Sequence, residues 1–193
     1  LPGNFEDPTG QAELLETSFL STRTRNFVEH KLNVKSQTVD AFIRTVVPQF
    51  MGTEGPDDLA AYQRLIVNLS NHAGLLDNDE LRMLLSETLL IPSMDGGWQK
   101  TNHVYFQTDE LISLLGNNKS IWIDKSRLHG SRSVTAFINN LGVLQKPIAA
   151  HLTDRLLGIA EAFSPDVKAR KSSEKVFYEL CDIYQENQSD SSI

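Results

Sequence analysis

A basic cluster between residues 125 and 132 is the stretch whose side-chain types and spacing suggest binding chemistry. The cluster consists of Lys125, Arg127, His129 and Arg132. These side chains surround Gly130 and precede an expected helix, with Trp122 a few residues upstream. Guanidinium groups beside a helix N-terminus can hold a phosphate or carboxylate, and an aromatic ring can stack on a base. The pattern therefore suggests contact with an anion or a polyanion.

A solvated loop is the competing interpretation of the same residues, and the sequence favours it. Asp124 offsets part of the positive charge, and exposed ion pairs in short loops contribute little. The whole chain carries a net charge of -7, which opposes a broad nucleic-acid footprint. Anion contact by this loop stays an alternative hypothesis.

Other patterns in the chain do not match known catalytic or metal-binding spacings. The five histidines show no His-x-x-x-His pair and no cysteine at ligand spacing; they are His30, His72, His103, His129 and His151. Asp77, Asp79 and Glu80 are acidic, but the stretch lacks the glycine and distal glutamate of a calcium loop. Cys181 lies in an apolar helical pattern, so we expect its side chain to be buried like that of a small hydrophobic residue. We predict no catalytic residues, no metal ligands and no cofactor.

The apolar periodicity predicts a mostly α protein. The apolar residues from Val39 to Phe50 recur at i, i+3, i+4, i+7, i+8 and i+11, which places them on one face of a helix. Pro48 is expected to end or kink that helix. Similar stripes predict helices over 12–32, from Pro56 to Gly74, from Asp77, from Ser131 or Ser133, from Pro147 and after Ser164-Pro165. The last helix carries Val176, Phe177, Leu180, Ile183 and Tyr184. These helices form the expected multi-helix bundle.

A small two- to three-stranded β-ribbon is expected within this bundle, around residues 89–123. The run ending at Pro92 and the turn at 95–97 predict a hairpin that leads to Trp98. A second apolar run covers 104–106, and 121–123 is a candidate third strand. Thr108 should cap a helix over 109–115 that stops at Gly116. Trp98 and Tyr105 are expected to lock two helical layers together.

The expected organisation is a helical subdomain over 1–76, a ribbon-plus-helix subdomain over 77–186 and a disordered tail over 187–193. No Pro/Gly/Ser linker separates the two subdomains, so we expect them to pack as one unit. No apolar run approaches the roughly 20 residues that cross a bilayer, so no membrane partner is predicted. The lone cysteine fits an intracellular location, cytoplasmic or nuclear.

The stretch from Leu90 to Leu157 resembles the regions downstream of the ATPase domain in sacsin-type and NO VEIN-type proteins. The resemblance is carried by Leu90-Ile91-Pro92 to Gly97-Trp98, Val104-Tyr105-Phe106 with Asp109, Leu111 to Gly116, and Leu141-Gly142-Val143 with Pro147. It implies a non-catalytic piece excised from a large protein that carries a Bergerat-type ATPase domain elsewhere. Glu29 and Asn33 have the spacing of one ATPase motif without its continuation, so no ATP-binding residues are assigned.

These patterns predict a non-enzymatic scaffold or interaction module, because the strong patterns are packing patterns. Its partners would be other domains of the parent protein or separate proteins. A nucleic-acid-associated module that uses the basic cluster is the alternative. A hydrolase whose site residues are scattered along the chain is the third reading.

Overall fold

The computed structural model describes residues 7, 9, 38–161 and 167–190 of the 193-residue chain. The predicted helix over 12–32 and the Ser164-Pro165 break lie outside these residues. Within them, the chain forms seven α-helices and a two-stranded antiparallel sheet. The predicted mostly helical bundle with a small β-ribbon is confirmed.

The first described helix, α2 (Val39–Met51), continues through Pro48, where the sequence predicted an end or a kink. The proline removes the donor for the carbonyl of Arg44, but Arg44 is exposed and water can take that role. The helix ends when the amide of Gly52, at φ 56°, donates to the Pro48 carbonyl. Six apolar side chains of α2 are buried.

The next two helices begin one to three residues later than the sequence predicted. In α3 (Leu59–Asn71), Asp58 accepts from the amide of Ala61, so Pro56 precedes the helix. In α4 (Asp79–Glu87), Asn78 accepts two backbone amides, and the predicted cap at Asp77 is wrong. Asn is as good an N-cap as Asp, which is why neighbouring cap residues are hard to separate by sequence.

The ribbon consists of β1 (Ile91–Pro92) and β2 (Trp98–Gln99), paired antiparallel. Residues 121–123, the candidate third strand, form the end of a 3₁₀ turn (Lys119–Ile121) followed by isolated bridges. These bridges join Ser93 to Ile123 and Tyr105 to Trp122, and a further one joins Tyr105 to Leu144. Short extended segments thus continue the ribbon across the molecule without forming longer strands.

Four more helices complete the described fold: α5 (Asp109–Leu115), α6 (Arg132–Asn140), α7 (Ala149–Glu161) and α8 (Val167–Asp190). The predicted Thr108 cap and the stop at Gly116 of α5 are confirmed, because Thr108 accepts from Leu111 and Gly116 has φ 71°. Ser131 caps α6 through the amide of Val134. Residues 187–190, predicted as tail, have helical backbone within α8.

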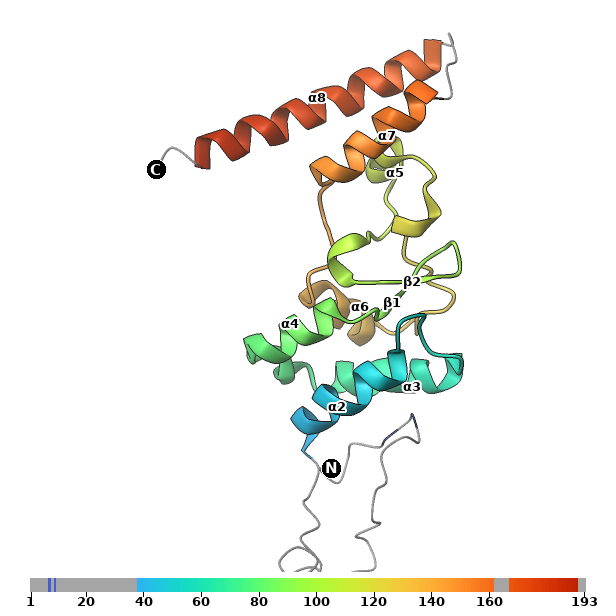
Figure 1. The fold of residues 1–193 in the computed structure, drawn as a ribbon, viewed down its shortest axis with the longest axis vertical. Coiled ribbons are helices and arrows are strands. Elements are labelled where there is room, and N and C mark those ends of the chain that lie inside the picture. Colours follow the sequence, from blue (N-terminus) through green and yellow to red (C-terminus); the bar gives the residue numbers. More distant parts are fainter. Residues whose placement is uncertain (1–6, 8, 10–37, 162–166, 191–193) are drawn as a thin grey trace, which may run out of the picture.

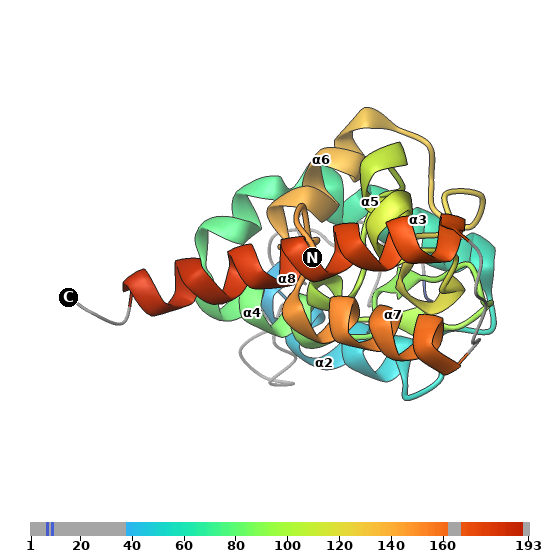
Figure 2. The same cartoon turned by 90° about the horizontal axis from the view of Figure 1, so that it is seen from above.

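Two hydrophobic clusters lie on opposite sides of the extended segments. The first, lower in Figure 1, gathers side chains of α2, α3, α4, α6 and the ribbon. The second joins α5, α7 and α8 above them. Figure 2 shows the same helices from above, with α7 lying beside α8. The first cluster takes residues from both sides of residue 76, and the division predicted there stays a prediction.

Three extended segments of two residues each contribute one side chain to each of the two clusters. Neighbouring side chains of an extended chain point to opposite sides, so a two-residue segment can serve both layers. The residues facing the first cluster are Val104, Ile123 and Val143, and those facing the second are Tyr105, Trp122 and Leu144. This middle layer therefore connects the two helical layers.

Trp98 anchors the ribbon to the first cluster. Its ring is 8% exposed and meets the edge of Tyr62, with the ring centroids 4.6 Å apart. Gly55, at φ 89°, lies against the indole so closely that an added Cβ atom would overlap it. Gly52 also has positive φ, but no heavy atom lies within 4 Å of an added Cβ atom there.

We expect Gly55→Ala to lower the free energy of unfolding by about 1–3 kcal/mol more than Gly52→Ala. Both variants place alanine in left-handed backbone, so their difference reports the displacement of the Trp98 ring. Urea denaturation of the two variants measures it. Equal destabilisation would show that the indole can move without cost.

Candidate functional site

The loop that carries the basic cluster is held from several sides. Asp124 closes its first turn by accepting from the amide and hydroxyl of Ser126. Leu128 is buried in the first cluster, and Gln63 of α3 donates to the carbonyl of Arg127 at 3.1 Å. The amide of Asp124 donates to the carbonyl of Pro92. The loop is therefore a fixed part of the ribbon layer.

Arg127 uses its guanidinium within the protein. Its Nη1 atom donates to the carbonyl oxygens of Gly96 at 2.7 Å and Gly97 at 3.2 Å. Its Cζ atom lies 4.6 Å from the centroid of the Trp98 ring, a cation–π distance. Arg127 thus clamps the hairpin turn, and its charge is directed inward.

The other three members of the predicted cluster are exposed. Lys125 is exposed, and its Nζ atom lies 5.7 Å from the centroid of the Phe106 ring. His129 and Arg132 are exposed on either side of Gly130. The side chain of Ser131 fills the capping position at the start of α6. Arg127 is thus directed to the hairpin and Lys125 to Phe106, while His129 and Arg132 are exposed.

Two carboxylates accompany the guanidinium of Arg127. The pKa of Asp95 is below its ordinary value because Ser93 and the amide of Gly97 donate to it, with a smaller contribution from Arg127. Burial raises the pKa of Asp124, but hydrogen bonds from Ser126 outweigh burial, so the net direction is also downward. Both groups are ionised at neutral pH, which leaves little net positive charge here for a polyanion.

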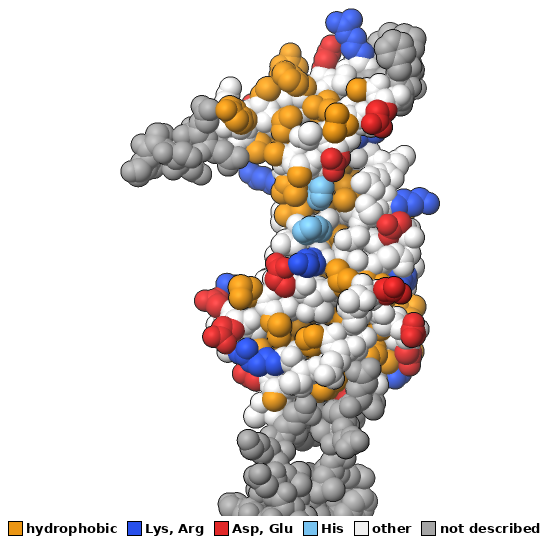
Figure 3. All heavy atoms as spheres, in the orientation of Figure 1, with side chains coloured by type: hydrophobic (Ala, Val, Ile, Leu, Met, Phe, Trp, Pro, Cys, Tyr) orange, Lys and Arg blue, Asp and Glu red, His pale blue; other side chains and the backbone are white. Residues whose placement is uncertain are grey.

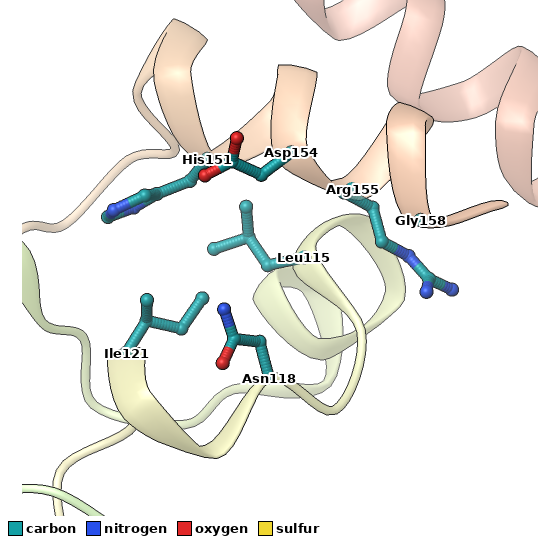
Figure 4. Close-up of a pocket in the computed structure, with 7 residues that line it drawn as sticks. All are labelled: Leu115, Asn118, Ile121, His151, Asp154, Arg155 and Gly158. Carbon is teal, nitrogen blue, oxygen red and sulfur yellow. The ribbon is translucent and has the colours of Figure 1, made fainter. Parts of the chain in front are cut away.

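A small pocket of about 180 Å³ lies between α7 and the segment that follows α5 (Figure 4). It is smaller than the roughly 300–1,000 Å³ of small-molecule sites. Seven residues line it: Leu115, Asn118, Ile121, His151, Asp154, Arg155 and Gly158. Its volume allows a small ion or a few waters.

The polar side chains of this pocket diverge. Figure 4 shows His151 and Arg155 pointing toward opposite ends of α7, with Asp154 between them. The guanidinium of Arg155 packs over Gly116, where an added Cβ atom would lie 2.7 Å from Cζ. Its Nε atom is buried with no hydrogen-bond partner among the described residues. A nucleophile and a base that face one reacting atom are not formed here.

Tyr105 and His151 form a hydrogen-bonded pair beside the pocket. The Tyr105 hydroxyl lies 2.9 Å from Nδ1 of His151 and accepts from the amide of Ile148 at 3.2 Å. Since the hydroxyl oxygen has a second lone pair, the direction of its bond with Nδ1 is set by the tautomer of His151. Tyr105 is 0% exposed, so a substrate cannot reach it. The pair fixes the start of α7, and its 46-residue separation gave no signal in the sequence.

An exposed aromatic face on α8 is the feature that the sequence pattern missed. Val176 is buried and Leu180 and Ile183 pack on the second cluster, as the predicted stripe requires. Phe177 and Tyr184 belong to the same predicted stripe but are 55% and 65% exposed. α7 and α5 cover only one side of α8, so the wider stripe is only partly buried.

This face is continuous with other apolar surface. Tyr178 and, on α7, Leu157 are also more than half exposed, and Figure 3 shows hydrophobic side chains gathered over α7 and α8. Cys181, predicted to be buried, is half-buried on the same helix. Large exposed apolar side chains that lie together are typical of interaction surfaces.

Searches of the described residues add two findings. No group of three or more His, Cys, Asp or Glu side chains among them could hold a metal ion. Within the same residues, no helix has both the length and the apolar character needed to cross a membrane.

Comparisons with known proteins found no matching family model, no matching curated protein and no matching solved structure.

We expect Arg127→Gln to lower the free energy of unfolding by about 2 kcal/mol, because hydrogen bonds from a charged group contribute about 1.5–3 kcal/mol. Arg132→Gln is the matched control, since Arg132 is exposed, and should change it by less than about 0.5 kcal/mol. Chemical denaturation measures both. Equal effects would place Arg127 in solvent with the rest of the loop.

Protonation of His151 should lower the stability of the protein in mild acid. Burial and the nearby His103 lower its pKa below the ordinary value, and Asp154 opposes this only in part. A group with a lowered folded pKa gives full stability above its unfolded pKa of about 6.5, and stability falls as the pH drops through the folded pKa. We therefore expect the unfolding midpoint in urea to decrease between about pH 8 and about pH 5.

His151→Gln should reduce this decrease, and His129→Gln, at an exposed histidine, should leave it unchanged. The same pH dependence in wild type and His151→Gln would contradict the assignment.

Proposed function

We propose that this chain is a non-enzymatic scaffold or interaction module of a larger protein of the sacsin or NO VEIN type. In that protein it would couple an ATPase domain elsewhere in the chain to other domains or to separate proteins. A cytoplasmic or nuclear location belongs to the same proposal. The observation that carries it is the exposed aromatic face of α8, formed by Phe177, Tyr178 and Tyr184.

The anchoring of α8 supports this role. Val176 is fully buried against the second cluster, and Lys175 donates to the hydroxyl of Ser113 on α5 at 3.0 Å. One side of the helix is therefore fixed while the aromatic side stays open. A rigid helix that presents aromatic side chains loses little conformational entropy on binding, which favours association with a partner.

The side-chain chemistry of the other sites supports a non-enzymatic role. The pocket beside α7 is small, and its polar groups diverge (Figure 4). Where Tyr105 and His151 form a hydrogen bond, the Tyr105 side chain is fully buried. Among the described residues, the structural features that stand out are therefore surfaces and packing contacts.

A nucleic-acid-associated module is the second candidate. Lys125, His129 and Arg132 are exposed near the capped start of α6, which leaves three cationic or titratable side chains for phosphate. The commitment of Arg127 to the hairpin and the ionised Asp95 and Asp124 weaken this candidate.

Amine cross-linking of the intact parent protein tests the interaction module. Lys171 lies on α8, so it should cross-link to residues beyond this chain or to a partner protein. Phe177→Ser combined with Tyr184→Ser should reduce those cross-links by about tenfold or more, because truncating aromatic anchors costs about 2 kcal/mol or more. Met83→Ser is the matched control, since Met83 is 65% exposed on α4. Identical cross-links in all three proteins would contradict the proposal.

Fluorescence anisotropy with a short labelled DNA or RNA at low salt tests the second candidate. We expect the same weak signal from wild type and from Lys125→Glu combined with Arg132→Glu. Binding that falls with rising salt, and that the double variant abolishes, would favour a nucleic-acid role instead.

A further inference from the structure

The side chain of His151 joins α7 to the middle layer. Its Nδ1 atom lies 2.9 Å from the hydroxyl oxygen of Tyr105, and the two rings meet edge to face with their centroids 5.5 Å apart. The same hydroxyl accepts from the amide of Ile148, the residue directly before α7, at 3.2 Å. Tyr105 itself is held in the middle layer by backbone hydrogen bonds with Ile121 and Ile123. The start of α7 is therefore tied to the rest of the fold at this hydroxyl group.

The Tyr105 hydroxyl has one proton to donate, and His151 is the partner that can accept it. The Ile148 amide can only donate, so Nδ1 is the remaining hydrogen-bond partner of the hydroxyl among the described residues. Neutral His151 accepts at Nδ1 when its own proton is on Nε2. This tautomer gives both the oxygen and the proton of the buried hydroxyl a partner, as buried polar groups require.

Protonation of His151 removes this acceptor, because both ring nitrogens then carry a hydrogen. The Nδ1–H and the Tyr105 O–H become two donors that face each other, and one of the two protons has no acceptor among the described residues. A buried donor without an acceptor has lost its bond to water and gained none in return. Separation of α7 from Tyr105 returns both groups to water.

The position of His151 adds two further penalties for a positive charge. It is the third residue of α7, and the unpaired amides of a first helical turn make the local potential positive. The charge of His103, which ends the 3₁₀ turn before Val104, also opposes it. Glu87 of α4 lies near His103, but its carboxylate is paired with Lys100. The lower side of the ring therefore offers no free carboxylate among the described residues.

The other groups around the ring do not cancel these penalties. Asp154, one turn further along α7, favours the charged form, but the net direction of the His151 pKa is downward. Arg155 points toward the opposite end of α7 (Figure 4). The segment that includes the end of α5 brings three residues to this pocket, none of which titrates: Leu115, Asn118 and Ile121.

Few buried side chains hold α7 and α8 against the middle layer. The chain enters α7 through residues 145–148, and α7 packs on α8. Among the described residues, these two helices contribute only Leu152 and Val176 to the fully buried part of the second cluster. Elements with little buried apolar contact open at a lower free energy than the rest of a fold. Loss of one hydrogen bond at the start of α7 therefore has a large relative effect.

We propose that the contact between His151 and the Tyr105 hydroxyl is a pH-operated latch. Uptake of one proton by His151 releases α7 and α8 from the middle layer, while the lower layer of α2, α3, α4 and α6 stays folded. Release exposes the apolar side chains of Leu152, Val176 and Trp122. The latch acts whatever α8 binds, so it goes beyond the proposed function.

Hydrogen exchange of the full chain at about pH 8 and about pH 5, corrected for the intrinsic effect of pH on exchange, tests the latch. Amides of α7 report the upper layer, and amides of α2, which contains no histidine, report the lower one. Protection of α7 should fall at least about fivefold more than protection of α2, a factor equivalent to the loss of one hydrogen bond. Equal losses in the two helices would mean that the whole fold is destabilised together, and they overturn the inference.

His151→Gln separates the latch from every other titrating group. Glutamine can accept the Tyr105 proton but cannot become protonated, so α7 and α2 should lose protection to the same extent between the two pH values. His129→Gln is the matched control, since His129 is exposed in the loop before α6, and it should keep the wild-type difference. An α7-specific loss that persists in His151→Gln overturns the inference.

Tyr105→Phe tests the hydroxyl group. Phenylalanine keeps the buried ring but removes the partner of His151 and of the Ile148 amide. Relative to α2, protection of α7 should already be about fivefold lower than in wild type at pH 8, and it should fall less than in wild type at pH 5. Protection of α2 shows that the variant is folded. Wild-type protection of α7 in this folded variant would show that the hydroxyl does not hold the helix, and the latch would be excluded.

Discussion

The alternation of side chains across three short extended segments is the constraint on which the rest of this structure depends. At 104–105, 122–123 and 143–144, one residue of each pair enters the lower cluster and its neighbour enters the upper one. Backbone hydrogen bonds fix the segments to one another: the Tyr105 amide donates to the Ile121 carbonyl, and the Leu144 amide donates to the Val104 carbonyl. A shift of one residue in any segment would exchange its two side chains between the clusters. Both helical layers therefore depend on the register of this thin middle layer.

The sequence predicted the parts of the fold that local chemistry determines. The Thr108 cap and the stop at Gly116 were predicted correctly, because one polar side chain and one left-handed glycine define those ends. Helix periodicity predicted five of the six buried side chains of α2; Met51 was not in the predicted stripe, and Phe50, which was, is only partly buried. It could not decide that Pro48 lies inside that helix, because this depends on whether the carbonyl of Arg44 reaches water. The sequence also did not show how long a strand 121–123 would form, because its pairing partners come from distant segments of the chain.

The candidate sites were harder to predict for the same reason. Arg127 was expected in a solvent-facing basic cluster, yet its hydrogen-bond partners, the carbonyls of Gly96 and Gly97, come from a turn 30 residues earlier. No sequence pattern connects the two. The stripe on α8 shows a second limit: its period identifies the apolar residues but not how many neighbouring helices will cover them. Phe177 and Tyr184 remain exposed because α5 and α7 reach only one side.

The unequal size of the two clusters has a consequence for how the protein moves. Among the described residues, twenty-four buried side chains form the lower cluster and eight form the upper one. Local opening follows the amount of buried apolar contact, so the layer of α5, α7 and α8 separates from the ribbon at a lower free energy than the layer below it. Any molecule that binds only the closed form of this upper layer also stabilises it by mass action. Binding of a ligand to α8 would thus be thermodynamically linked to the population of the closed upper layer.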